Sequence, residues 1–186
     1  LRRRNNSIGR AVTTAYIRLL QGTPIVVLLM ILYYVIFTDD SVSGMAVAVV
    51  AFTLNFAAYV SEMMRTGIDA VPAGQMEAAL AMGYTRTSAF FRIVMPQAAL
   101  HFLPVYKGEV VSLIKSTSVV GYIAVQDLTK MSDIIRSRTY DALFPLLTTA
   151  VIYFAVAALL GYLVSRIEVK LQPDRVNRGV KGVKLQ

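Results

Sequence analysis

Four long apolar segments divide the chain, and polar residues separate each segment from the next. Each segment holds about twenty residues, which is the length of a helix that crosses a bilayer. The pattern predicts membrane spans at residues 16–37, 42–60, 105–125 and 142–165. Only four residues separate the first two spans, so these should form a helical hairpin. We therefore predict an all-α fold, a polytopic membrane helix bundle with one long loop at residues 61–104.

Helix-breaking residues fall in two of these spans. The stretch Gly22-Thr23-Pro24 interrupts the first span, and Pro145 lies in the first turn of the last one. Proline costs least in a first turn, because its missing N–H would have no partner there. The last span is therefore expected to continue through its proline.

Composition also indicates a membrane protein. Hydrophobic residues make up 56% of the sequence and charged residues only 16%, whereas soluble domains carry about a quarter charged residues. The absence of cysteine excludes a disulfide framework and a cysteine-based metal site. The basic residues behind the net charge of +8 flank the apolar runs, which is typical of membrane flanks and not of a nucleic-acid-binding face. We expect no cofactor, no metal and no nucleic acid.

Positive charges indicate the orientation, because Lys and Arg gather on the cytoplasmic side of a membrane. With four spans, both chain ends and the 61–104 loop lie on one side. That side carries most of the basic residues, Arg10 and Arg18 among them. The opposite side has only Lys130, Arg136 and Arg138, beside several aspartates. The loop is therefore predicted to be cytoplasmic.

The 61–104 loop has the pattern of two short helices with a break between them. Pro72 suits a helix start, residues 75–82 are mostly good helix formers, and Gly83 can adopt the left-handed conformation that ends a helix. Apolar residues then recur at helical spacing until Pro96, which should stop or kink the second helix. Two such helices either dock into a groove of a partner protein or fold back on the bundle or the lipid headgroups.

The same loop carries a known motif. It reads Glu77-Ala78-Ala79, three residues, Gly83, nine residues, Ile93 and then Pro96. This pattern resembles the EAA loop of ABC importer permeases, with Met95 where leucine is usual. The resemblance implies that residues 66–103 form a cytoplasmic coupling loop whose helix sits in a groove of an ATPase subunit. The ATPase-coupling residues would be Glu77, Ala78, Ala79, Gly83, Ile93 and Pro96.

Further segments resemble permeases for polar amino acids, of the histidine, glutamine or arginine type. They are residues 22–24, 57–68, 71–75 and 113–118. Two positions depart from the family pattern, since Ser116 replaces a common aspartate and Gln21 replaces a usual arginine. Members usually have five spans. The resemblance thus implies that residues 1–186 form a single transmembrane permease domain that lacks the family's first span.

The function implied by the resemblance is the permease component of an ATP-driven importer for a polar amino acid, in a bacterial inner membrane. Its partners would be ABC ATPase subunits, a second permease subunit, identical or homologous, and an extracytoplasmic solute-binding protein or fused binding domain. The chain has no GxxxxGK phosphate loop, so it should not be an enzyme and must borrow an ATPase. The alternatives are an ion-gradient-driven secondary transporter or channel, disfavoured by the few spans and the EAA loop, and a membrane-embedded enzyme, disfavoured by the lack of a catalytic cluster.

Polar side chains inside the predicted spans are candidates for the substrate path, because ionisable groups at bilayer depth are costly and usually functional. Glu109, Ser112 and Ser116 share one helix face, and Lys115 lies well round from Glu109. Glu109 would bind the substrate ammonium, and either Lys115 or free amide groups near the Gly22–Pro24 break would bind its carboxylate. Alternatively, Glu109 lies near the cytoplasmic interface and snorkels beside Lys107. Asn55 and Tyr59 share a face of the 42–60 span, and Gln21 occupies the position before Gly22 where the family usually has arginine. The substrate-path candidates are therefore Glu109, Ser112, Lys115, Ser116, Asn55, Tyr59 and Gln21.

Overall fold

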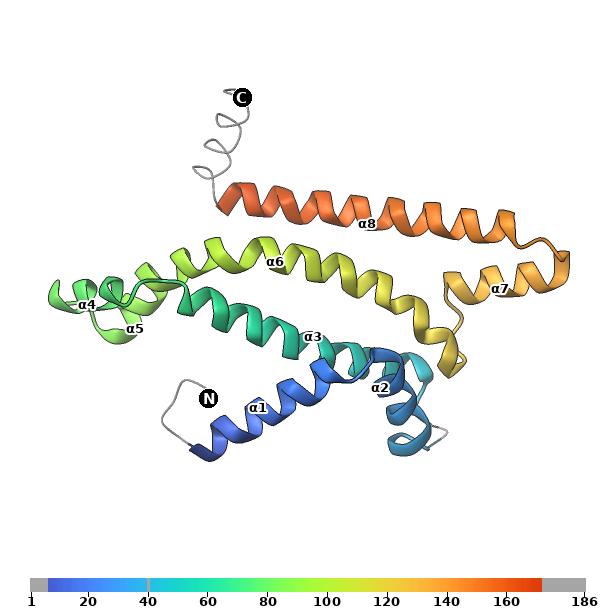
Figure 1. The fold of residues 1–186 in the computed structure, drawn as a ribbon, viewed down its shortest axis with the longest axis horizontal. Coiled ribbons are helices and arrows are strands. Elements are labelled where there is room, and N and C mark those ends of the chain that lie inside the picture. Colours follow the sequence, from blue (N-terminus) through green and yellow to red (C-terminus); the bar gives the residue numbers. More distant parts are fainter. Residues whose placement is uncertain (1–6, 40, 172–186) are drawn as a thin grey trace, which may run out of the picture. The chain divides into compact units, whose positions relative to one another are not determined.

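The structure is a computed structural model that describes residues 7–39 and 41–171. Within these ranges every regular element is helical, which confirms the all-α prediction (Figure 1). In chain order the elements are α1 (Ser7–Gly22), α2 (Ile25–Ile31), η1 (Leu32–Ile36), α3 (Gly44–Asp69), α4 (Ala73–Ala81), α5 (Arg86–Ala89), η2 (Phe90–Val94), α6 (Met95–Ser116), η3 (Thr117–Ile123), α7 (Leu128–Thr139) and α8 (Leu143–Leu171). The elements η1 and η2 are π-helical, and η3 is a 3₁₀ helix.

Two of the four predicted spans are single helices, α3 and α8. Both are long and apolar enough to cross a membrane. α3 continues beyond its predicted end and finishes at Asp69, whose Oδ2 lies 2.7 Å from Arg65 Nη1. α8 begins at Leu143 and passes through Pro145 in its first turn, as predicted. Hydropathy marks the apolar part of each helix, whereas the helix itself extends into the polar zone because its backbone bonds are satisfied there as well.

The first predicted span is not one helix. α1 ends at Gly22, and the axes of α1 and of α2 with η1 are bent by 107° (Figure 1). Pro24 is the N-cap of α2 with φ −56° and ψ 135°, and a proline disfavours helical geometry at the residue before it. The interruption seen in the sequence therefore separates two differently directed helices, which form one broken span or a re-entrant loop.

The third predicted span begins before residue 105. α5, η2 and α6 follow one another without a gap, and α6 runs through Pro104 to Ser116. The sequence predicts that Pro96 stops or kinks the second loop helix, and the structure shows that the helix does not stop there. The Met95 amide donates to the Phe90 carbonyl, five residues back. This π-turn widens the helix just before the proline, where the ring would otherwise meet the carbonyl four residues back.

Contacts divide the chain into two compact units. The first comprises the residues up to Glu62 together with Ser112–Ala157. Its core joins α1, α2, η1, the first part of α3 and η3, and its centre is Leu29, Val47 and Ile123, each at most 1% exposed. Gly44 of α3 lies so close to η3 that an added Cβ would be 3.2 Å from the Ile123 carbonyl oxygen.

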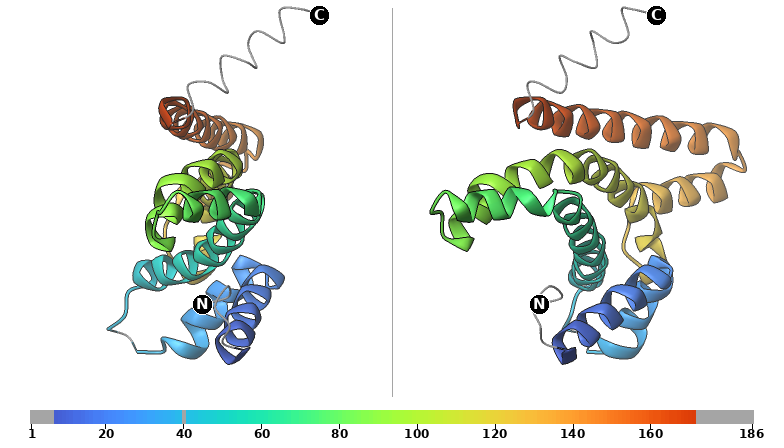
Figure 2. Two further views of the ribbon diagram at one scale, coloured as in Figure 1. Left: turned by 90° about the vertical axis from the view of Figure 1, so that its left-hand side faces the viewer. Right: turned by 60° about the vertical axis from the view of Figure 1, so that its left-hand side comes forward.

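The second unit comprises Met63–Val111 and the chain from Ala158 onward. Its core is a small apolar cluster in which α4 and η2 pack against the end of α3 and the start of α6, namely Val71, Val94 and Ala98 with Ile68, Met76, Phe90 and Phe102. Gly67 is buried, and a Cβ added there would lie 3.0 Å from the Ala98 carbonyl oxygen. The cluster positions α4 and α5 at the N-terminal end of α6 (Figure 2).

Candidate functional site

The loop between α3 and α6 begins with the helix that carries the Glu-Ala-Ala motif. α4 runs from Ala73 to Ala81 with Pro72 at its N-cap, which agrees with the helix predicted at 75–82. Glu77 and Ala78 are exposed, whereas Ala79 is completely buried. Helix geometry explains the difference, because positions two residues apart point to opposite sides. The motif therefore contributes one residue to the underlying core and two to the surface.

Gly83 ends α4 in the left-handed conformation. Its φ is +86°, which glycine adopts without a steric penalty. The Gly83 amide donates to the Leu80 carbonyl at 3.0 Å, and the Tyr84 amide donates to the Ala79 carbonyl at 3.1 Å. These two bonds form a Schellman motif, which satisfies carbonyls that the helix end would leave open. The predicted glycine helix stop is confirmed.

Thr85 starts the next helix directly after this turn. Its Oγ1 accepts a hydrogen bond from the Ser88 amide at 3.3 Å, as an N-cap residue does. Ala89 and Val94, two of the apolar residues that recur at helical spacing, are buried, and Arg86 and Arg92 are exposed. The turn between the two loop helices is thus hydrogen-bonded to α4 through the Gly83 and Tyr84 amides and to α5 through Thr85.

The loop also exposes large apolar side chains, which we call the loop surface: Leu80, Met82, Tyr84 and Phe91, with exposed fractions of 36%, 67%, 38% and 63%. Of the remaining motif residues, Gly83 and Pro96 are exposed and Ile93 is half-buried. Apolar side chains gathered in an otherwise polar segment indicate an interaction surface.

Four of the substrate-path candidates lie on α6. Glu109 and Ser116 are half-buried, and Ser112 and Lys115 are exposed. The Ser116 hydroxyl donates to the Ser112 carbonyl at 2.9 Å, so this group is bonded to its own helix. Within the part of the chain that the structure describes, Glu109 and Lys115 form no ion pair with each other. Their six-residue offset places them on different sides of the helix.

The other three candidates lie on α1 and α3. Asn55 Nδ2 donates to the Leu20 carbonyl at 3.1 Å, so its amide joins α3 to the last turn of α1. Gln21 follows Leu20 directly and is half-buried, as is Tyr59. The structure therefore brings Ser112 together with Ser116, and Asn55 together with the turn that carries Gln21. Asn55 has a structural bond that its polarity alone does not reveal.

A family model described as a binding-protein-dependent transport system inner membrane component matches residues 1–173. The chain belongs to this family. A putative glutamine transport system permease protein of Rickettsia conorii is 34% identical over 89% of this chain and 77% of that protein. An arginine transport system permease protein of Bacillus subtilis is 33% identical over 86% of this chain and 74% of that protein. A crystal structure of an amino acid ABC transporter with histidines superposes with a TM-score of 0.77 at 34% identity, covering 89% of this chain and 78% of that chain.

Membership in this family confirms the cellular location that the sequence predicts. Within the described residues two single helices, α3 and α8, are long and apolar enough to cross the bilayer, and there are up to four such spans if each bent helix pair counts as one. The resemblance to permeases of ABC importers, first carried by the 77–96 motif, is confirmed as well.

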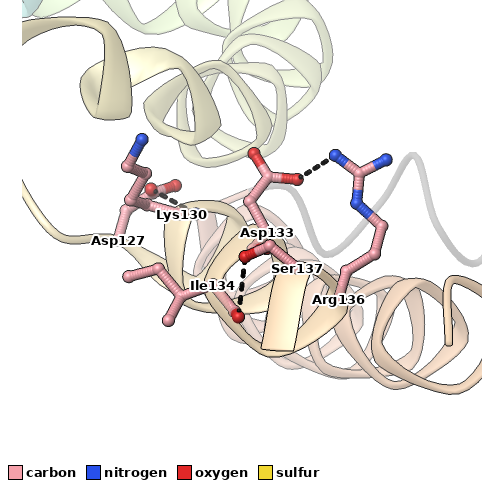
Figure 3. A network of polar contacts seen from close by, with 6 residues as sticks. All are labelled: Asp127, Lys130, Asp133, Ile134, Arg136 and Ser137. Atoms are coloured by element: carbon pink, nitrogen blue, oxygen red, sulfur yellow. Dashed lines mark hydrogen bonds and ion pairs between the residues drawn. The ribbon is translucent and has the colours of Figure 1, made fainter. Parts of the chain in front are cut away.

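The helix α7, which lies within the described residues, is not revealed by the hydropathy pattern. Asp127 caps its start, because Asp127 Oδ1 accepts from the Lys130 amide at 2.9 Å and Oδ2 accepts from the Thr129 amide at 3.2 Å. Arg136 Nη2 lies 3.1 Å from Asp133 Oδ1 on the exposed side (Figure 3). An aspartate directly before a helix is a recognisable start signal, so the cap could have predicted this element where hydropathy could not.

Proposed function

We propose that this chain is the permease component of an ATP-driven importer that takes up a polar amino acid. It forms part of the translocation path and works with a second permease subunit, ABC ATPase subunits and an extracytoplasmic solute-binding protein or fused binding domain. Amino-acid transport is the role named for its relatives from Rickettsia conorii and Bacillus subtilis. The chain itself does not catalyse a reaction, and ATP is hydrolysed by its partner.

The ordered loop between α3 and α6 carries this proposal. Its inner side is already occupied, since Ala79, Ala89 and Val94 are buried in the unit that holds the loop. Its outer side keeps the four side chains of the loop surface in water. Complete burial of a fully exposed apolar side chain contributes about 1.5–3 kcal/mol, and each of these contributes less because it is already partly covered. A groove in an ATPase subunit that receives α4 and its C-terminal turn would cover these apolar side chains. Such helix-in-groove docking is a common mode of recognition.

Purification of the intact complex tests the function. The full-length permease that contains this chain, extracted in mild detergent, is expected to bring an ATPase subunit with it. The ATPase activity should rise when the amino-acid-loaded solute-binding protein is added. A permease that arrives without an ATPase, yet supports uptake driven by an ion gradient in vesicles, would show instead that the chain is a secondary transporter.

Reversing the charge of Glu77 is expected to weaken docking. Glu77 is exposed on α4, two residues before the buried Ala79. Like charges brought together in an interface are costly, and a loss of about 1.4 kcal/mol corresponds to a tenfold weaker complex. We expect Glu77→Lys to reduce ATP-driven uptake about tenfold or more at normal membrane content. The matched control is Asp133→Lys on α7, where loss of an exposed pair costs about 1 kcal/mol at most. Equal uptake by the two variants would contradict the docking surface.

Glu109 is proposed to hold the substrate ammonium during passage. It is half-buried within the apolar stretch of α6 and has no ion-pair partner on that helix in the described ranges. Glu109→Gln keeps the shape and removes the charge. Losing a charge-assisted hydrogen bond costs about 1.5–3 kcal/mol, equivalent to about a 10- to 150-fold change in affinity. The measurement is uptake against substrate concentration, normalised to assembled complex, with Asp133→Asn as the control. A snorkelling Glu109 would leave both the half-saturation and the rate unchanged.

A further inference from the structure

Three different faces run along α1, because residues three and four positions apart lie on the same side of a helix. One face contains Thr13, Ile17 and Leu20, of which Ile17 and Leu20 are buried in the core of the unit and Thr13 is half-buried. A second face exposes apolar or small side chains, Ile8, Val12, Ala15 and Leu19. The third face is polar and is formed by Arg10, Thr14, Arg18 and Gln21. We call this third face the polar stripe of α1.

Two hydrogen bonds hold the C-terminal part of α1, and with it the end of the polar stripe, against the middle of the helix α3. Tyr16 Oη donates to the Leu54 carbonyl at 2.7 Å, and Asn55 Nδ2 donates to the Leu20 carbonyl at 3.1 Å. Both contacts fall near the middle of α3, a helix of 26 residues that is apolar enough to span. Such a helix is about 39 Å long at a rise of about 1.5 Å per residue. Arg18 lies between Tyr16 and Leu20 in α1, so it also lies close to the middle of the span.

This placement differs from the one that the charge pattern predicts, which counts Arg18 among the cytoplasmic flanking residues. Arg18 is exposed, and within the described ranges no carboxylate lies at ion-pairing distance from it. Arginine remains charged at any relevant pH. Charged groups at bilayer depth almost always face a bundle interior or a water-filled cavity, because an unpaired charge against lipid is costly.

We propose that the guanidinium of Arg18 binds the carboxylate of the transported amino acid, towards the C-terminal end of the polar stripe of α1. This inference rests on the proposed import function. The planar guanidinium offers a fork of N–H donors that matches a carboxylate with two parallel hydrogen bonds. A lipid phosphate has the same chemistry, but headgroups lie at the bilayer surface and not near the middle of α3. Every amino acid carries the α-carboxylate, so this contact serves transport without selecting a side chain.

The test compares three variants in the complete transporter, reconstituted in vesicles with its ATPase and its binding protein. Radiolabelled glutamine and arginine serve as the probes. Arg18→Gln is expected to reduce the uptake rate per assembled complex about 10- to 100-fold. The ATP hydrolysis stimulated by the loaded binding protein should change less than about twofold, because Arg18 lies outside the loop that contacts the ATPase. Arg138→Gln on α7 removes one exposed positive charge elsewhere and should behave like the wild type.

Rescue distinguishes a substrate contact from a structural role. Arg18→Gln combined with Gln21→Arg returns the guanidinium to the same stripe, one turn further on, and should restore at least part of the uptake. Arg18→Lys keeps the charge but not the fork and should be intermediate; it carries the test if Arg18→Gln does not assemble. Uptake by Arg18→Gln equal to that of Arg138→Gln overturns the proposal. So does a parallel loss of ATP hydrolysis, or a defect that follows the anionic lipid content of the vesicles.

Failure of this inference remains distinguishable from failure of the proposed function. If the wild-type complex shows no ATP-driven uptake of any amino acid, the function itself is wrong. If the wild type transports and Arg18→Gln transports equally well, only the role of Arg18 is wrong.

Discussion

Replacing Gly83 by valine is expected to reduce ATP-driven uptake about tenfold or more while the permease still inserts into the membrane. Gly83 has a φ of +86°, and a β-branched residue is a steric outlier there. The left-handed conformation costs about 1–2 kcal/mol for an ordinary L-residue. A Cβ at this position would meet no atom within 4 Å, so the penalty arises from the backbone alone. The chain can relieve it only by abandoning the turn that joins α4 to α5.

The consequence follows from the two bonds of that turn. Both the Gly83 and the Tyr84 amides donate to carbonyls of α4, and changing φ at Gly83 breaks both. α4 and α5 would then lose their mutual orientation, and the loop surface would no longer match a groove. Uptake and binding-protein-stimulated ATP hydrolysis should therefore fall together, by about tenfold or more for a loss of about 1.4 kcal/mol or more of docking energy.

Asparagine provides the matched control at the same position. It tolerates positive φ better than other residues with a side chain, so Gly83→Asn should retain most of the uptake. Membrane content of both variants is measured by quantitative immunoblotting. Wild-type uptake by Gly83→Val at normal content would show that this turn does not couple to an ATPase.

Replacing Gly67 by valine is expected to destabilise the second unit directly. A Cβ there would lie 3.0 Å from the Ala98 carbonyl oxygen and 3.0 Å from Phe102 Cβ and Cδ1. Backbone and Cβ atoms cannot rotate away, so α3 and α6 must separate. Overpacking of this kind costs about 1–3 kcal/mol, and valine adds two further methyl groups. The assembled permease should show a lower apparent Tm in detergent and a reduced yield of complex.

Gly74 offers the comparison for this substitution. It lies in the first turn of α4, and a Cβ there would meet nothing within 4 Å. Gly74→Ala should leave the apparent Tm unchanged or slightly raised, because alanine is favoured over glycine in helices by about 1 kcal/mol. If Gly67→Val melted at the wild-type temperature, the close approach of α3 to α6 would be wrong.

Local sequence features predicted the elements whose cause is local. The spans α3 and α8 follow from runs of apolar residues, and Pro145 is tolerated in the first turn of α8. Gly83 predicted the end of α4 because glycine adopts the left-handed conformation without a steric penalty. The buried residues Ala89 and Val94 follow from helical spacing. Each of these inferences needs only a residue and its near neighbours.

Other features do not follow from hydropathy and residue preference alone. Pro96 does not stop the helix, because the backbone forms a π-turn before it and continues into α6. α7 is too polar for a hydropathy search, although Asp127 caps it. The hydrogen bond from the Asn55 amide to the Leu20 carbonyl of α1 is not visible in the sequence, because it joins residues 35 positions apart.

By itself the sequence determined that this protein is a helical inner membrane permease, because apolar run length and the 77–96 motif depend only on residue type and spacing. Only the tertiary structure decided the angle between α1 and α2 and the depth of Arg18. The break at Pro24 permits many angles between α1 and α2, and the observed 107° is selected by packing against α3 and η3. The depth of Arg18 follows from bonds between residues 35 and 38 positions apart. No local pattern specifies such pairs, since they form only when separate helices meet.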